Sequence, residues 1–526
     1  MSGVRFELNG TDVEVEGSGS LLDALREELG VRSVKDGCAP QGQCGCCTVL
    51  VDGAPRVSCV TPVRRVAGRS VTTVDGLDTE TADVWADAMV GCGASQCGFC
   101  TPGIVMRLEG LRRSGKPMDT PAIERALAAH VCRCTGWLGI VEAAECVASG
   151  TSCAATGGER DLDAAATRAT IEGGPQRVDA AVVLGGVVYG DDDAPSDALV
   201  AVPDALGDYH VAESLDAARR AAGLVQGRNT TVAPSAPIEC PDGDWAVVLQ
   251  TGWVEPAYLE TDSAWCAPGG APSDPLANAG AFGGKTRSPV GDDARRLADE
   301  HGRTVRVRWS REHVVRHGPK RPPMAIALRS DGTGVVRVAR TAGIAAALRR
   351  VTDDVVIDEV DLAGPPTSAD LRGAGWAELA IARAALSTPP GAPVTITAPD
   401  GATATATVTN PGSDAAAIEV RVACGRPLDP TVLRSYCIGA AHQAVGWVTS
   451  EGLAVAADGT VGDLTIRSFG IVRPADMPAV AVQIADDDSD PVRGSDAVFA
   501  AVAAAVWIAQ GLPPTWPTGR PLHSDA

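Results

Sequence analysis

Hydrophobic and polar positions alternate in two stretches near the start of the chain and then change to a helical spacing. Residues 5–15 and 48–52 have the two-residue alternation and β-branched content of strands. Asp52-Gly53 follows the second stretch and favours the tight turn of a β-hairpin. Apolar residues then recur at helical spacing in three stretches, 81–91, 102–113 and 120–130.

A second change of pattern follows at about residue 150. Residues 151–166 are rich in small and polar residues and show no periodicity, which predicts a linker. Residues 394–422 alternate again in strand fashion, with turn sequences at 399–401 and 410–412. The pattern therefore predicts an α+β protein, with a domain boundary near the linker.

Four cysteines near the start of the chain form a first candidate metal site. They are Cys38, Cys44, Cys47 and Cys59, with five residues between the first two. Plant-type ferredoxins have a similar spacing, C-x4-C-x2-C followed by a distant fourth cysteine, and their four thiolates hold a [2Fe–2S] cluster. The alternative is a zinc site, but such sites usually pair two CxxC sequences, which this segment lacks. We therefore predict a [2Fe–2S] cluster here.

Four more cysteines form a second candidate site. They are Cys97, Cys100, Cys132 and Cys134, in the pattern C-x2-C, a long gap and C-x-C. Zinc fits this spacing when it is taken alone, but the neighbouring first set favours a second [2Fe–2S] cluster. Two clusters in one short region predict a path for single electrons and hence a redox protein.

Composition narrows the class of protein. A chain of 526 residues is long enough for three or more folded units. Its formal charge of −21 argues against nucleic acid or a membrane surface as a partner, and it has no apolar run long enough to span a membrane. The start, MSGVRFELNG, lacks the pattern of a signal peptide, and cluster motifs with free thiols favour the cytoplasm. The remaining eight cysteines are expected to be buried small apolar residues rather than ligands: Cys46, Cys92, Cys146, Cys153, Cys240, Cys266, Cys424 and Cys437.

Residues 4–148 resemble the iron–sulfur subunit of the molybdenum hydroxylases, the family of xanthine dehydrogenase, aldehyde oxidase and carbon monoxide dehydrogenase. The matching segments include LLDALREELGV, TVLVDG, QCGFCTPG and HVCRCTGW. The resemblance implies a β-grasp ferredoxin-type domain in residues 1–76 and a four-helix [2Fe–2S] domain in residues 77–150. It also places Gln96 at the family glutamine that touches the pterin of the molybdenum cofactor, where a plain surface amide is the alternative.

Residues 167–526 resemble, more weakly, a shortened form of the molybdopterin-binding subunit of the same family. ANAGAFGGKTRSP is similar to its glycine-rich cofactor loop and PPTSADLRGAGWAE to a second loop on the cofactor side. Glycines leave backbone N–H groups free to donate to an anionic pterin, although a plain turn is the alternative for the first loop and a surface salt bridge for the arginine of the second. The resemblance implies cofactor contacts from Gly280, Phe282, Gly283, Gly284 and Arg372.

The same region departs from the family pattern at important places. It is about half as long, and the family glutamine beside the metal has no counterpart. Thr286 and Ala374 replace a glutamate and an aromatic residue of the purine-oxidising members, which argues against xanthine as the substrate. The position of the family's catalytic glutamate falls on Ser495 or Asp496. Asp496 is the candidate base, and its alternative role is the N-cap of a helix over 497–507.

Three functions are compatible with these observations. The first is a molybdenum-dependent oxidoreductase that oxidises a small-molecule substrate and passes electrons through the second cluster and then the first to an external acceptor. Because no FAD domain is recognisable, a separate flavin or molybdenum subunit is implied. The second is an electron-transfer subunit with a catalytically degenerate C-terminal docking region, which the missing glutamate and glutamine favour. The third is a non-enzymatic assembly or interaction protein, and the intact cluster motifs argue against it.

Overall fold

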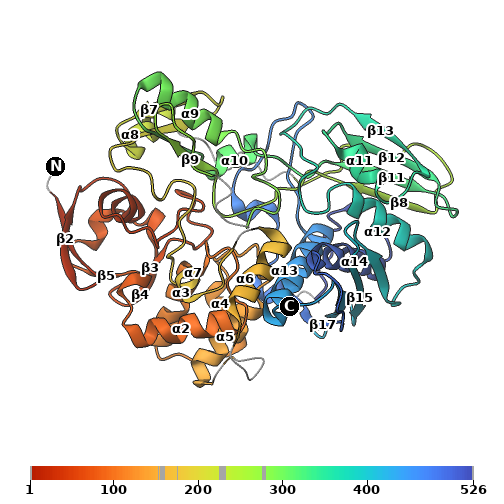
Figure 1. Cartoon of the computed structure of the whole chain (residues 1–526), viewed down its shortest axis with the longest axis horizontal. Coiled ribbons are helices and arrows are strands. Elements are labelled where there is room, and N and C mark those ends of the chain that lie inside the picture. The colour runs from red at the N-terminus through yellow and green to blue at the C-terminus, as the bar shows by residue number, and fades with distance from the viewer. Residues whose placement is uncertain are drawn as a thin grey trace.

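The computed structural model confirms the α+β class and places four mixed sheets around a helical centre (Figure 1). None of the helices in its described residues is long and apolar enough to cross a membrane. The structure describes residues 3–151, 153, 160–174, 176–223, 233–274 and 280–523.

The N-terminal sheet has the strand order β2-β1-β5-β3-β4 and lies at the left of Figure 1. Asp52 and Gly53 connect β3 to β4 with φ angles of 48° and 75°, the left-handed pair that a two-residue hairpin turn requires. The predicted strands and hairpin are therefore present. The strands are β1 (Val4–Leu8), β2 (Thr11–Val15), β3 (Thr48–Val51), β4 (Ala54–Val57) and β5 (Ser70–Thr72).

Four helices follow this sheet, and the three predicted ones are among them. Asp78 and Asp119 cap two of them by accepting hydrogen bonds from the N–H groups of Thr81 and Ala122. The indole of Trp85, fully buried between the helices, donates to Glu109 at 2.9 Å. The helices are α2 (Thr79–Gly91), α3 (Thr101–Arg113), α4 (Thr120–Leu127) and α5 (Leu138–Ser149).

The segment after α5 differs from its prediction in two ways. Helix α6 (Leu162–Gly173) begins inside the predicted linker 151–166, because the Asp161 side chain caps it by accepting from two backbone N–H groups. Residues 152 and 154–159 of that linker lie outside the described residues. Cys146 and Cys153, expected as buried small apolar residues, are only partly buried and form a disulfide, since α5 and the chain that follows it turn back on each other.

The C-terminal region contains the other three sheets, with strand orders β7-β6-β10-β9, β13-β12-β11-β8-β18 and β14-β15-β16-β17. The strands are β6 (Leu199–Pro203), β7 (Tyr209–Ala212), β8 (Val247–Thr251), β9 (Ser263–Cys266), β10 (Val305–Arg308), β11 (Met324–Leu328), β12 (Gly334–Ala339), β13 (Val355–Val360), β14 (Val394–Thr397), β15 (Thr403–Thr409), β16 (Ala417–Ala423), β17 (Ala479–Ile484) and β18 (Thr515–Trp516). The helices beside them are α7 (Ala180–Val183), α8 (Leu215–Ala222), α9 (Val290–His301), α10 (Arg311–His317), α11 (Ile344–Arg349) and α12 (Trp376–Ser387).

Two long helices, α13 (Pro430–Thr449) and α14 (Gly494–Ala509), pack against each other to the right of the centre of Figure 1. Residues 497–508 of α14 are all buried, as expected for a helix that is apolar on every side. Helix α14 begins at Gly494, so Asp496 lies inside its first turn and is not the N-cap of a helix that starts at residue 497.

Candidate redox site

The first set of cysteines converges in the loop before β3 and in the turn after β4. Cys38, Cys44, Cys47 and Cys59 are all at most 4% exposed. Hydrogen bonds from Cys44 and Cys59 hold the pKa of the Cys38 thiol well below its ordinary value. The N–H groups of Gln43 and Cys44 also donate to Cys38 Sγ at 3.3 Å. Four buried sulfurs with backbone donors aimed at one of them fit a [2Fe–2S] cluster.

The second set converges between the start of α3 and the loop before α5. Cys134 Sγ lies 3.5 Å from Cys97 Sγ. A hydrogen bond from Cys100 lowers the pKa of Cys132 to about 6, with a further contribution from Thr135. The four sulfurs thus form two contacting pairs, all at most 7% exposed, and this donor set also fits a [2Fe–2S] cluster.

Cys46 lies between the two sets. Its hydrogen bond with Cys44 lowers its pKa, but burial and the electrostatic influence of the neighbouring cysteines Cys38, Cys47 and Cys97 raise the pKa above its ordinary value. Gly103 of α3 packs directly on the backbone of Gly45 and Cys46. The two cysteine sets are therefore neighbours in space, although they are far apart in the sequence.

Arg133 joins the second set to the C-terminal region. It stands between Cys132 and Cys134, and its guanidinium donates two hydrogen bonds to Glu451, at 2.5 and 2.7 Å. A third goes to the carbonyl oxygen of Pro256 at 3.0 Å. Both partners of this ion pair are less than one tenth exposed, so separating the charges would leave each buried without a counter-charge.

The predicted glycine-rich loop lies against the second set, though residues 278 and 279 of it are outside the described part. Gly280 and Ala281 line a small space beside Cys97, Cys100 and Cys134. A Cβ on Gly283 (φ 89°) would overlap the carbonyl oxygen of Asp370, and one on Gly284 would meet the ring of Tyr258. Close packing of the protein on itself thus accounts for these two glycines.

The remaining predicted cofactor residues meet farther along the same loop. The guanidinium of Arg372 lies over the ring of Phe282, 4.5 Å from its centroid. It also donates to Asp496 at 3.0 Å and to Ser495 at 3.0 Å. Arg372 is 8% exposed, so the alternative of a surface salt bridge is wrong, and the candidate base Asp496 is the partner of its buried guanidinium.

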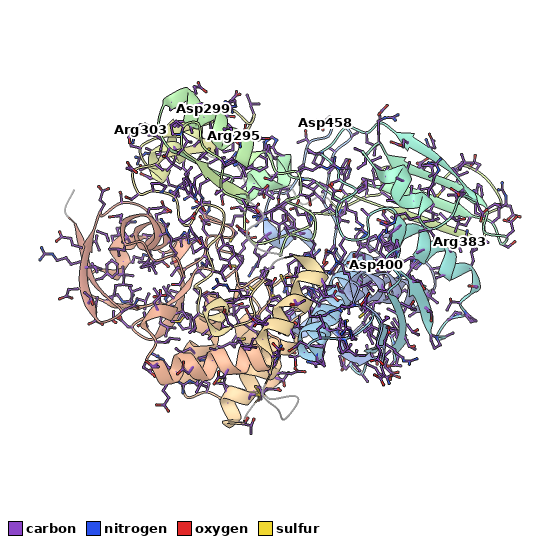
Figure 2. The ribbon with its side chains drawn as sticks, viewed as in Figure 1. Arg295, Asp299, Arg303, Arg383, Asp400 and Asp458 are labelled. Atoms are coloured by element: carbon purple, nitrogen blue, oxygen red, sulfur yellow. A yellow bond between two sulfur atoms is a disulfide. The ribbon has the colours of Figure 1, made fainter. Side chains whose placement is uncertain are left out.

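Further buried ion pairs surround this contact. Arg321 pairs with Glu378 at 2.8 Å and Lys320 with Glu255 at 2.9 Å. Charged residues such as Asp400 and Asp458, by contrast, lie on the outer surface (Figure 2). The buried charged residues around Phe282 and Arg372 are therefore each paired with a residue of opposite charge, which offsets the cost of burying them.

The space left between these side chains is small. A cavity of about 40 Å³ is lined in part by Phe282, Arg372 and Gln443, whereas pockets for small molecules measure roughly 300–1,000 Å³. In this arrangement the residues do not fit a pterin cofactor. Gln96 does not line this cavity: it is buried, and its amide donates to Ser435 at 2.9 Å. Burial rules out the alternative of a surface amide at that position.

Three residues at this junction were not predicted. Gln443 donates to the carbonyl oxygen of Arg133 at 3.0 Å, and Glu451 pairs with the same arginine. Both come from α13 or the turn after it, more than 300 positions from the cysteines. Arg133 could have been predicted from the sequence. It lies between two cysteines of the second set, so its side chain is expected to be buried with them.

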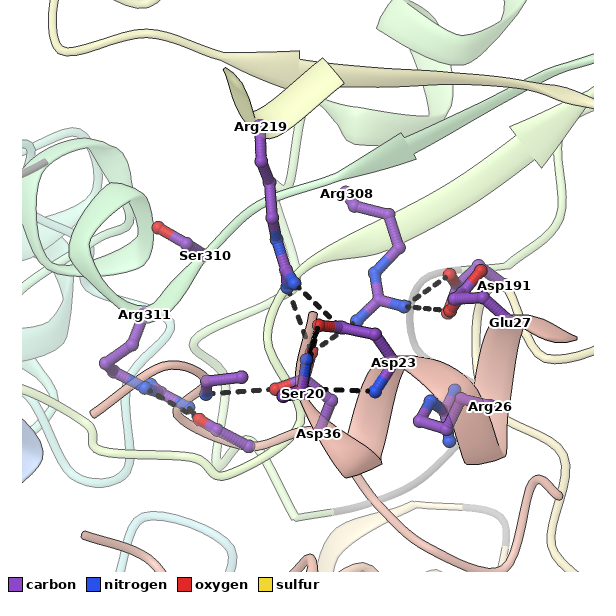
Figure 3. Close-up of polar contacts among 12 residues, drawn as sticks. Ser20, Asp23, Arg26, Glu27, Asp36, Asp191, Arg219, Arg308, Ser310 and Arg311 are labelled. Atoms are coloured by element: carbon purple, nitrogen blue, oxygen red, sulfur yellow. Dashed lines mark hydrogen bonds and ion pairs between the residues drawn. The ribbon is translucent and has the colours of Figure 1, made fainter. Parts of the chain in front are cut away.

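A network of charged residues holds the first cysteine loop to the C-terminal region (Figure 3). Asp36, two residues before Cys38, accepts hydrogen bonds from Arg219 of α8 and Arg308 of β10, both at 3.2 Å. Burial tends to raise the pKa of Asp36, but Arg219 and Arg308 together hold it below its ordinary value. In addition, Arg311 of α10 donates to the carbonyl oxygen of Gly37.

Comparisons with known proteins agree with this arrangement. Residues 73–145 match the [2Fe-2S] binding domain family. A probable xanthine dehydrogenase subunit of Bacillus subtilis is 37% identical over 142 residues, which is 27% of this chain and 82% of that protein. Aldehyde oxidoreductase of Megalodesulfovibrio gigas is 38% identical over 133 residues, 24% of this chain but only 15% of that protein.

The fold extends this likeness beyond the iron–sulfur region. The structure of aldehyde oxidoreductase from Desulfovibrio gigas matches with a TM-score of 0.67 at 14% identity, covering 96% of this chain and 97% of that one. Among the sequence relatives are proteins named as small FeS subunits, such as that of nicotinate dehydrogenase from Eubacterium barkeri, 32% identical over 140 residues, 26% of this chain and 88% of that protein. The chain therefore belongs to the molybdenum hydroxylase family of xanthine dehydrogenases and aldehyde oxidoreductases.

Proposed function

We propose that the protein is an iron–sulfur oxidoreductase that carries single electrons from a substrate-oxidising molybdenum centre to an external acceptor. The observation that carries this proposal is the pair of buried four-thiol sets, with Cys46 between them. Cys97, Cys100, Cys132 and Cys134 would hold the cluster that receives the electrons, and Cys38, Cys44, Cys47 and Cys59 the cluster that delivers them. Soft thiolates at these positions suit iron and permit reversible one-electron chemistry.

The direction of transfer is supported by what surrounds each set. The second set adjoins the glycine-rich loop and, through Arg133, the buried residues around Phe282 and Arg372. The first set adjoins a loop, Ala39-Pro40, that faces a much larger cavity. Electrons would thus enter from the centre of the molecule and leave near α8 and α10.

A second candidate function differs in where the molybdenum is held. The small cavity and the pairing of Arg372 with Asp496 favour an electron-transfer subunit whose C-terminal region docks to a separate molybdenum subunit. A flavin-binding subunit is then a further expected partner. The substrate in either case is a small molecule oxidised by the family's chemistry, and the thiols that remain free support a cytoplasmic location.

Metal analysis of the full-length protein purified from its native host tests both candidates. Two [2Fe–2S] clusters require about four iron atoms per chain. Four iron with about one molybdenum would support turnover by this chain alone, and four iron without molybdenum would support the electron-transfer subunit. Absence of iron from protein that is folded by circular dichroism would overturn the proposed function.

A further inference from the structure

A large cavity lies between the iron–sulfur region and the C-terminal region, on the side of the first cysteine set. Its volume is about 370 Å³, within the usual range for small-molecule sites. One wall is the segment Ala39-Pro40, and the others come from β6, α8 and the chain from Arg308 to His313. Two fused six-membered rings with small substituents fit within this volume.

The cavity is close to the first cluster site. Ala39 is bonded directly to Cys38, and consecutive Cα atoms are about 3.8 Å apart. The loop is held in place by Arg311, which donates to Gly37 O at 3.1 Å, and by Gln41, which donates to Glu312 at 2.7 Å. A molecule in the cavity would therefore contact the loop that carries a cluster ligand.

The lining combines apolar surface with cationic donors. The apolar part includes Trp309, Val202 and Leu215, which are buried. Arg308 is 6% exposed and is surrounded by carboxylates: its Nη2 donates to Asp36, and its Nη1 lies 3.3 Å from Asp191 and 3.8 Å from Glu27. Nη1 nevertheless makes no hydrogen bond among the described residues. Arg219, whose side chain is 31% exposed, also lines the cavity, and it pairs with Asp23 and Asp36. A flat apolar ring with hydrogen-bond-accepting oxygens fits such a lining.

We propose that this cavity binds a bicyclic quinone, which is the external acceptor of the electrons from the first cluster; this inference rests on the proposed function. The quinone takes up two electrons, one at a time as the cluster is oxidised and reduced again, together with two protons from solvent, and leaves as the hydroquinone. The apolar wall holds the rings, and the guanidinium groups donate to the quinone oxygens as negative charge develops there.

The test uses the full-length protein with its clusters, reduced with dithionite, freed of excess reductant and kept without oxygen. Menadione, a naphthoquinone, is added, and the return of the visible cluster absorbance gives the rate of reoxidation. Ala222 lines the cavity at the end of α8, so Ala222→Trp would fill it. Ala221→Trp is the matched control, because Ala221 is exposed on the same helix and outside the cavity. Iron content and ferricyanide reoxidation report on the clusters independently of the cavity.

The inference predicts saturable reoxidation by menadione, with the half-saturating concentration raised about tenfold or more in Ala222→Trp, a factor equivalent to 1.4 kcal/mol, and unchanged in Ala221→Trp. Ferricyanide should oxidise all three proteins alike. Equal menadione kinetics in the three proteins, or a faster reaction with flavin mononucleotide that ignores Ala222→Trp, would overturn the quinone site and leave the proposed function intact. Protein without clusters would overturn both.

Discussion

The two halves of the molecule bury reactive groups in opposite ways. The eight thiols of the two cysteine sets are all buried, and the strongest interactions of Cys38, Cys59, Cys100 and Cys134 are with other thiols. Around Arg372 every charged group named above faces a group of opposite sign. Several thiols buried together need a bound cation before they are stable as thiolates. Buried side chains that already form ion pairs need no such cation. The comparison indicates that the iron–sulfur region needs a metal to stabilise its buried thiols. The buried charges around Arg372 are already paired with other side chains and need no metal.

The largest expected effect tests the metal half of this comparison. Cys134→Ser removes a sulfur from the second set, and we expect iron to fall from about four to about two atoms per chain, with one of the two reduced-cluster signals lost in electron paramagnetic resonance. Cys47→Ser should remove the other signal. Cys240→Ser is the control, since Cys240 lies outside both sets and is partly exposed. Full iron content in Cys134→Ser would show that the ligand assignment is wrong.

The next effect tests the buried ion pair that joins the iron–sulfur region to the C-terminal region. Glu451→Gln leaves the buried guanidinium of Arg133 without its counter-charge, and breaking such a pair costs about 3–5 kcal/mol. The midpoint of urea unfolding, followed by tryptophan fluorescence, should fall markedly. Glu14→Gln, which breaks the exposed pair with Arg5, should cost at most about 1 kcal/mol. Similar small shifts in both variants would mean that the pairing at Arg133 contributes little.

A third prediction concerns the contact between the two halves. Gly439 of α13 packs on the loop of the second set, where a Cβ would overlap the carbonyl oxygen of Cys134. We expect Gly439→Ala to destabilise the protein by about 3 kcal/mol or more and to disturb the second cluster. Gly291→Ala in α9 gains the same helix propensity, but its Cβ meets only Pro272 at 3.5 Å, so it should be neutral or stabilising. Unfolding midpoints and the cluster signal distinguish the two variants.

The sequence was most informative where the important residues are close together in the chain. The hairpin at Asp52-Gly53, the helices α2 to α4 and the two cysteine sets all depend on short spacings. The linker prediction was too long because the cap at Asp161 was overlooked. Likewise, nothing in the local pattern at Cys146 and Cys153 indicated that they form a disulfide.

In the C-terminal region, the resemblance to the family identified the residues that meet in space, but the sequence could not show what role they have. Phe282, Arg372 and Asp496 do meet in space, yet their distances depend on how α14 and two separate loops pack. Whether Arg372 faces a cofactor or a carboxylate cannot be derived from LRGAG, because the deciding partner is 124 positions away. Gln443 and Glu451 escaped notice for the same reason.

The smallest predicted effect is on the pH dependence of stability. It arises from a residue of α13, in the C-terminal region, and not from the iron–sulfur region. His442 is fully buried, its Nε2 donates to Val472 O at 2.9 Å, and Nδ1 has no hydrogen-bond partner among the described residues. Burial lowers the pKa of His442 to about 4, with Arg133 lowering it further and the Val472 hydrogen bond opposing the shift. The folded protein thus keeps this group neutral while the unfolded chain takes up a proton below about pH 6.5.

The contribution of His442 to stability is therefore present above pH 6.5 and is lost as the pH falls towards 4. Between pH 7 and pH 5 the loss amounts to about 2 kcal/mol. His442→Gln keeps an N–H donor for Val472 but cannot be protonated, so its unfolding midpoint should fall less between these two pH values than that of the unaltered protein. His210→Gln, at a partly exposed position, should leave the difference unchanged. An identical pH dependence in His442→Gln would place the acid sensitivity elsewhere, in the iron–sulfur half or at the other buried histidines.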